Sequence, residues 1–116
     1  MKYEKVYSMD FKNIYPLLVG KAARKGRSEE EVMEIICWLT GYTPGDVRNI
    51  LEKGMPYGDF FLKAPCLNPD REKIRGTICG TRIEEIDEPL MKEIRCLDKL
   101  VDELAKGRPM DRILRR

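Results

Sequence analysis

The longest regular pattern in the sequence is "DEPLMKEIRCLDKLVDELAKG", residues 87–107. Its apolar residues alternate four and three positions apart: Leu90, Ile94, Leu97, Val101 and Leu104. This spacing places them on one face of a helix that starts after two acidic residues and ends at a glycine. Such a helix has to cover its apolar stripe, either with the rest of the chain or with a copy of itself.

Two further helices are predicted in "SEEEVMEIICWLTGYTPGDVRNILEKG", residues 28–54. Ser28 and the glutamate three residues later form a capping box, and Thr43 precedes a proline at the first helical position. A glycine follows each apolar stripe, where it can end the helix. Met33 and Cys37 widen the apolar face of the first helix, which we therefore expect to be largely buried.

The remaining signals are weaker. The sequence "YPLLVGKAARKG" predicts a helix that starts near Tyr15 or Pro16, because a proline in the first turn loses no intrahelical hydrogen bond. Short helices are predicted within residues 55–65 and 108–116. Glycines and β-branched residues near 72–84 favour extended backbone, so a small hairpin or irregular segment is expected there.

Together these signals predict an all-α fold, a compact orthogonal bundle of five to six short helices in a single domain, residues 1–116. With 42% hydrophobic and 36% charged residues, the composition is that of a globular protein with a charged surface. No segment approaches the roughly 20 apolar residues that span a bilayer, and the N-terminus lacks the apolar region of a signal peptide. We therefore expect a cytoplasmic protein with no membrane partner.

The sequence contains no histidine, which excludes histidine-dependent catalytic triads and histidine-ligated metal centres. Its four cysteines are widely spaced: Cys37, Cys66, Cys79 and Cys96. They form no Cys-x-x-Cys pair of the kind that binds zinc, and no phosphate-binding glycine motif is present. We expect no metal and no other cofactor, and we interpret Cys37 and Cys96 as core residues.

Several stretches resemble one family. They are "YPLLVGKAARKGR", "IICWLTGY", "FFLKAP", "ICGTRIEEI" and "PLMKEIRCLDKLVDELAKG". In this order, from about Tyr7 to Leu114, they are similar to a family of small uncharacterised prokaryotic proteins known as domain of unknown function 2200. The resemblance implies a compact, mostly helical domain and no particular activity. The sequence departs from the family pattern at Cys96, where a larger residue is expected, and at Thr81, where a bulkier one is common.

Residues 28–54 raise the question of whether this hairpin reads DNA, since two helices joined by a tight turn can place the second in the major groove. A recognition helix needs basic or amide side chains at its exposed N-terminal positions. The second helix instead starts with Gly45 and Asp46, and Asp46 would face phosphates unfavourably. A packed hairpin is the favoured interpretation, and nucleic acid is a partner that we consider but do not favour.

Basic residues gather at the end of the predicted first helix and at the C-terminus. The candidates for phosphate binding are Lys21, Arg24, Lys25, Arg27, Arg108 and Arg112, with Lys106, Arg115 and Arg116 beside the last two. Positive charge at either place also complements a helix C-terminal dipole, which is the favoured explanation for each cluster alone. If the fold brought the two clusters together, phosphate binding would become the better explanation.

Cys79 is the only candidate for a catalytic residue, and a weak one. A thiol beside a glycine and close to Arg75 and Arg82 can have a lowered pKa. No histidine is available as a base, and a cysteine is more often a small buried hydrophobe. The acidic run at 84–88 could likewise hold a divalent cation, but its charge suits the start of the following helix.

Trp38 and Tyr42 lie one helical turn apart and could line a pocket or a partner surface. With Cys79 and Arg82 they complete the candidates for ligand or partner binding. Burial in the core is the favoured explanation for both aromatic residues.

The favoured function is that of a small helical binding or assembly module without catalytic activity. One alternative is a nucleic-acid-binding protein that uses the helix-turn-helix-like hairpin and the basic clusters. A second is a small-molecule enzyme that uses Cys79. A homo-oligomer through the 89–106 helix is a further expectation, because its stripe is regular enough to pair with a copy of itself.

Overall fold

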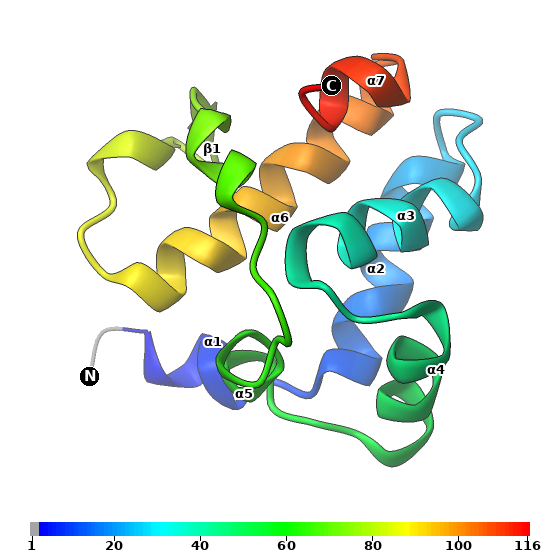
Figure 1. Ribbon diagram of the computed structural model, residues 1–116, viewed down its shortest axis with the longest axis vertical. Coiled ribbons are helices and arrows are strands. Elements are labelled where there is room, and N and C mark those ends of the chain that lie inside the picture. The colour runs from blue at the N-terminus through cyan, green and yellow to red at the C-terminus, as the bar shows by residue number, and fades with distance from the viewer. Residues whose placement is uncertain (1–2) are drawn as a thin grey trace.

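The structure is a computed structural model that describes residues 3–116, and within these residues the chain forms seven α-helices. They are α1 Glu4–Ser8, α2 Phe11–Ala23, α3 Glu29–Thr40, α4 Pro44–Lys53, α5 Tyr57–Leu62, α6 Pro89–Ala105 and α7 Met110–Ile113. Between α5 and α6 lie the 3-10 helices η1 Pro69–Lys73 and η2 Ile83–Glu85, and the antiparallel strands β1 Thr77–Ile78 and β2 Thr81–Arg82. The all-α prediction and the expected hairpin near 72–84 are both confirmed (Figure 1).

Helix α6 is the element that contacts the largest number of others. It packs against α2, α3, α5, α7 and the β1 strand, and it crosses the middle of the molecule (Figure 1). Its predicted stripe is buried from Ile94 to Leu104, while Leu90 at the start is half-buried. Because the chain itself covers this stripe, a homo-oligomer through residues 89–106 would have to use the polar face of α6.

A cluster of aromatic side chains joins the start of α2 to α5. The rings of Phe11 and Phe60 stack with their centroids 3.9 Å apart, and both side chains are fully buried. The hydroxyl of Tyr42 donates a hydrogen bond of 2.7 Å to the carbonyl of Phe60. The segment after α3 is thereby fixed to α5.

Helix α2 begins earlier than predicted, at Phe11 instead of near Tyr15 or Pro16. The carboxylate of Asp10 accepts hydrogen bonds from the backbone amides of Lys12 (3.0 Å) and Met55 (3.2 Å), so it caps α2 and ties its start to the α4–α5 connection. Pro16 consequently lies inside the helix, on its exposed side, where water can replace the hydrogen bond that proline lacks. The start was placed too late because the prediction put Pro16 in the first turn and did not use the local cap that Asp10 provides.

The other predicted helix signals are confirmed with one exception. Ser28 and Glu31 form a capping box at α3, and Thr43 and Asp46 form one at α4. At α6, however, the side chain of Glu88 makes no cap and instead accepts a hydrogen bond from the hydroxyl of Tyr7. That bond holds α1, which was not predicted, against the start of α6. No helix within residues 3–116 is long and apolar enough to cross a membrane.

Gly41 closes α3 in a place where only glycine fits. Its φ is +83°, and a Cβ atom built on it would lie 2.8 Å from both the backbone nitrogen and the carbonyl oxygen of Cys66. The amide of Cys66 donates to the carbonyl of Thr40 at 3.0 Å, so the chain after α5 passes directly over the end of α3.

We expect Gly41→Ala to destabilise the protein more than Gly26→Ala. Both glycines have a left-handed φ, +83° and +78°, and an alanine in that conformation costs about 1 kcal/mol at either place. Among residues 3–116 no atom lies within 4 Å of a Cβ at Gly26, whereas the contact with Cys66 should add about 1–3 kcal/mol at Gly41. Urea unfolding of the two variants gives the difference, and equal losses would mean that the segment at Cys66 moves away without cost.

Candidate functional site

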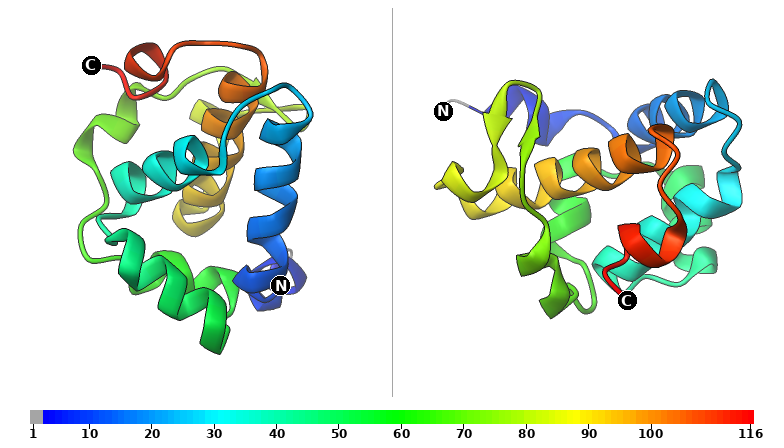
Figure 2. Two further views of the ribbon diagram at one scale, coloured as in Figure 1. Left: turned by 90° about the vertical axis from the view of Figure 1, so that its right-hand side faces the viewer. Right: turned by 90° about the horizontal axis from the view of Figure 1, so that it is seen from above.

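The two basic clusters of the sequence converge in the fold. The C-terminal ends of α2 and α6 lie side by side, with α7 next to them (Figure 2). We call this surface the basic end; its cations are Lys21, Arg24, Lys25, Arg27, Lys106, Arg108, Arg112, Arg115 and Arg116. Asp102 joins the clusters directly, because its two carboxylate oxygens lie 3.2 Å from Nζ of Lys21 and 3.0 Å from Nζ of Lys106.

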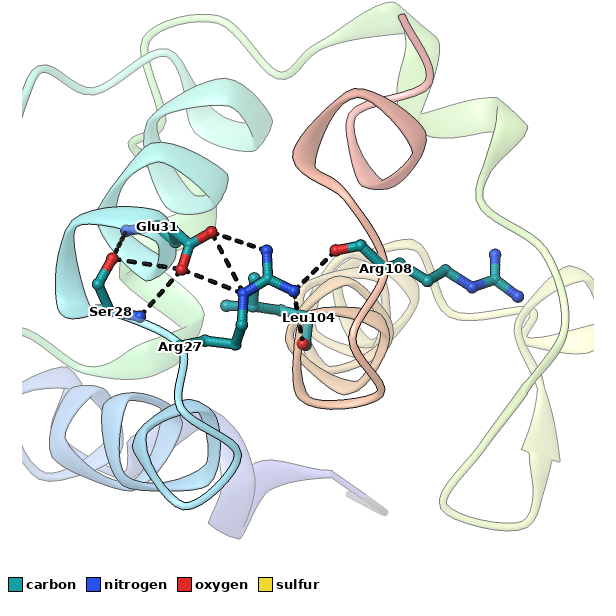
Figure 3. A network of polar contacts seen from close by, with 5 residues as sticks. All are labelled: Arg27, Ser28, Glu31, Leu104 and Arg108. Atoms are coloured by element: carbon teal, nitrogen blue, oxygen red, sulfur yellow. Dashed lines mark hydrogen bonds and ion pairs between the residues drawn. The ribbon is translucent and has the colours of Figure 1, made fainter.

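Arg27 makes the second connection between the clusters (Figure 3). Its Nη1 donates hydrogen bonds to the carbonyls of Leu104 (3.2 Å) and Arg108 (2.8 Å), which lie at and beyond the last turn of α6. Its Nη2 lies 2.7 Å from the carboxylate of Glu31 in the first turn of α3. One guanidinium therefore meets carbonyls at the end of one helix and a capping carboxylate at the start of another.

The same contacts change the titration of Glu31. The hydrogen bond from Arg27, followed by the one from the backbone amide of Ser28, lowers the pKa of this carboxyl from 4.5 to about 2. Arg27 was predicted as a phosphate-binding candidate, but its side chain is engaged within the fold.

Other cations of the two clusters remain free. Arg24, Lys25 and Arg112 are exposed, and their side chains form no ion pair within residues 3–116. Arg108 is also exposed, and its nearest carboxylate, that of Glu103, is 4.0 Å away. Arg108, Pro109 and Arg112 line a hollow of about 300 Å³. Four of the six predicted phosphate-binding candidates are thus exposed and without a close carboxylate, two of them directly after α2 and two in the α6–α7 segment.

The last two residues of the basic end are already paired. Arg115 binds the buried carboxylate of Glu103 through two hydrogen bonds, 2.6 and 3.0 Å long. Arg116 lies 3.0 Å from Asp111 and 3.6 Å from Glu34. These ion pairs fix the C-terminal segment on α6 and α3.

A second concave surface lies on the predicted hairpin. The α3–α4 groove has a volume of about 430 Å³ and is lined by Tyr15, Glu29, Glu30, Met33, Glu34, Cys37, Pro44, Arg48 and Leu51. The sequence analysis did not predict it, and it interpreted Cys37 as a core residue; the thiol is instead half-buried beside the groove. The signal was the widened apolar face of α3, since Met33 and Cys37 extend beyond the stripe that the core covers.

The second helix of the helix-turn-helix-like hairpin, α4, lies away from the basic end. Helix α4 lies at the opposite end of the molecule from the α2–α3 connection and the α6–α7 connection (Figure 1). At the start of α4, the carboxylate of Asp46 accepts a hydrogen bond of 3.0 Å from the amide of Thr43, so it serves as a cap.

Cys79 lies in the turn of the β1–β2 hairpin, with an exposed thiol. Cys79 and Gly80 both have positive φ, +53° and +78°, the conformation of a tight two-residue hairpin turn. The cation in contact with its sulfur is Arg95 of α6, whose Nη1 lies 3.4 Å from Sγ and 2.9 Å from the carboxylate of Asp98. Arg75 and Arg82 were predicted for this role from the sequence.

Trp38 and Tyr42 differ in burial. Tyr42 is buried, and Trp38 is half-buried with its carbonyl accepting a hydrogen bond of 3.2 Å from the side-chain amide of Asn68. In the acidic run, Glu84 accepts a hydrogen bond from the amide of Gly76, at 3.0 Å. Within residues 3–116, no group of three Cys, Asp or Glu residues could hold a metal ion.

The fold and these surfaces define a small all-α protein with a basic end and a separate acidic-rimmed groove. The chain belongs to the family described as an uncharacterized protein conserved in bacteria, DUF2200, whose model matches residues 5–115. Its structure is similar to the crystal structure of the uncharacterized protein SP1917, with 51% sequence identity and a TM-score of 0.92 over 97% of this chain and 92% of that one. The comparison with curated proteins gives no match. The function of the family is not established.

The Arg27–Glu31 pair should make the stability of the protein depend on pH. Because the folded-state pKa of Glu31 lies below its ordinary value, the ionised pair stabilises the protein above about pH 4.5, and this stabilisation is lost as the pH falls towards 2. The gap in unfolding free energy between the natural protein and Glu31→Gln should therefore be widest near neutral pH and shrink in acid. Urea unfolding across this pH range measures it.

Glu52→Gln provides the matched control, since Glu52 is exposed on α4 and forms no ion pair within residues 3–116. Its gap from the natural protein should stay small at every pH. A Glu31→Gln gap that does not change between neutral pH and pH 2 would contradict the assignment.

Proposed function

We propose that the protein is a non-catalytic binding module and that its basic end binds the phosphate backbone of duplex nucleic acid. The observation that carries this proposal is the convergence of the two basic clusters. Each cluster alone is explained by the dipole of its own helix. The joined ends of α2 and α6, however, carry several exposed cations without a close carboxylate, which no helix end requires.

The charge distribution supports the same surface. The basic end has nine cations, which form ion pairs with five carboxylates: Glu31, Glu34, Asp102, Glu103 and Asp111. Its excess of positive charge exceeds the +2 of the whole chain, so the remainder of the molecule is net acidic. Such an asymmetric distribution orients a polyanion towards one end of the protein even when the overall net charge is small.

The residue types favour contact with the backbone over contact with bases. Arginine supplies a planar fork of donors that matches phosphate oxygens, and Arg24, Arg108 and Arg112 are all available. The four-residue α7 is too short to act as a recognition helix in a groove. Binding should therefore be independent of sequence.

The distribution of aromatic residues favours a duplex over a single strand. Proteins that bind single strands stack bases on aromatic side chains. No aromatic residue occurs in residues 16–37 or 62–116, which include the whole basic end. A surface with cations and without stacking side chains matches a regular double-stranded backbone.

We expect the protein to bind a labelled DNA duplex with an affinity that falls steeply as salt rises. The double variant Arg24→Glu, Arg112→Glu should bind at least about tenfold more weakly at low salt, and its plot of log affinity against log salt should lose about two units of slope. Fluorescence anisotropy over a sodium chloride series measures both quantities.

The control is the double variant Lys53→Glu, Lys63→Glu, which changes the net charge by the same amount. Lys53 ends α4 and Lys63 follows α5, both at the opposite end of the molecule, and neither forms an ion pair within residues 3–116 (Figure 1). This variant should bind nearly as well as the natural protein. Equal loss in both variants, or no binding of the natural protein at low salt, would overturn the proposal.

A further inference from the structure

We propose that the α3–α4 groove is a docking site for a basic amphipathic helix of a partner protein. None of the nine cations of the basic end lines this groove, although Arg116 of that end contacts the groove through Glu34, and the charge of its α3 side is opposite to that of the basic end. The groove has an apolar floor that the core does not fully cover, an acidic rim, and an arginine of this chain that already contacts the rim.

The floor of the groove consists of apolar side chains that stay partly open. Met33, Cys37 and Leu51 are all half-buried, and Pro44 is exposed. They line a volume of about 430 Å³, which is at the small end of the range for ligand sites, about 300–1,000 Å³. That volume suits a few apolar side chains of a docked helix, and a flexible methionine can adapt to their shape.

The rim is acidic on the α3 side. Glu29, Glu30 and Glu34 border the groove, and Arg48 is the single cation among its lining residues. The carboxylate of Glu29 accepts a hydrogen bond of 2.9 Å from the hydroxyl of Tyr15, which fixes this part of the rim against α2. The other two glutamates are exposed. The rim is therefore complementary to lysine and arginine.

The chain itself provides an example of this complementarity. A guanidinium nitrogen of Arg116 lies 3.6 Å from a carboxylate oxygen of Glu34, although the two residues are far apart in sequence and both are about half exposed. The Arg116 guanidinium thus lies beside the Glu34 carboxylate even though both side chains are exposed to water, which competes for their hydrogen bonds.

An amphipathic helix satisfies both properties at once. Residues at i, i+3, i+4 and i+7 of such a helix present one apolar stripe, and basic residues beside that stripe would face the glutamates. A polyamine carries the charge without the apolar stripe, and an uncharged helix carries the stripe without the charge. Only the combination fits a groove with this floor and this rim.

The test uses a labelled peptide of about 14 residues, or about four helical turns, built from leucine and lysine with leucine at helical spacing. A peptide of the same composition in scrambled order cannot present one apolar stripe. We expect the first peptide to bind at least about tenfold more tightly than the second. Fluorescence anisotropy gives both affinities, and spermine at equal charge concentration should not displace the bound peptide.

Two variants locate the binding. Glu30→Gln, Glu34→Gln should weaken peptide binding at least about fivefold, whereas Glu52→Gln, Glu72→Gln should leave it unchanged. Glu52 and Glu72 are exposed, form no ion pair within residues 3–116 and do not line the groove, so the control removes the same charge from positions outside its lining.

The reactivity of the Cys37 thiol measures whether the floor of the α3–α4 groove is covered. In a Cys66→Ser, Cys79→Ser background the two exposed thiols are absent, and Cys96 is buried. Saturating peptide should slow the reaction of Cys37 with a thiol reagent at least about tenfold. Equal binding of the scrambled peptide, displacement by spermine, unchanged affinity in the Glu30, Glu34 variant, or an unprotected Cys37 would each overturn the proposal.

Discussion

Burial of the apolar face of α6 is the constraint on which the rest of the structure depends. Helices α2 and α3 lie along this face, α5 packs at its start, and α7 returns over its end. Each of these helices is too short to be stable alone in water, so most of its stability comes from the shared core. The charged surfaces of the molecule are therefore positioned by where each short helix ends on α6, and the basic end is the clearest result of this arrangement.

At the basic end, the stability of the fold and the proposed function use different members of one cluster. Arg27 and Lys21 are engaged with helix ends and carboxylates, while Arg24 and Lys25, adjacent to them in sequence, stay free. The internal pairs hold α2, α3 and α6 together and so fix the distance between the free cations of the two clusters. Substituting Arg27 would change the fold and the surface together, which makes it a poor probe of binding and explains why Arg24 and Arg112 are the better ones.

Much of the fold could be predicted from the sequence because its signals are local. Capping boxes, glycine ends and the stripe of α6 each depend on residues within one or two turns, and the helices that they predict are present. The start of α2 was missed because Pro16 was placed in the first turn, whereas the helix begins after Asp10, which caps it locally and is held in addition by the distant amide of Met55. The surfaces were harder still: the basic clusters could be identified, but their convergence depends on how α2 packs on α6. The α3–α4 groove could not be predicted, since only the packed hairpin shows which apolar residues the core leaves uncovered.

The position of Asp102 between two lysines has a consequence for sequence variation. Lys21 and Lys106 each pair with a different oxygen of the same carboxylate, so either lysine alone can neutralise it. If Lys21 is replaced by a neutral residue, Asp102 keeps its ion pair with Lys106; if Lys106 is replaced, Asp102 keeps its ion pair with Lys21. In neither case does the carboxylate lose all of its charge partners. The two lysines are therefore redundant, and either one can be substituted while Asp102 is retained. Simultaneous loss of both lysines would leave a partly buried carboxylate without these ion pairs.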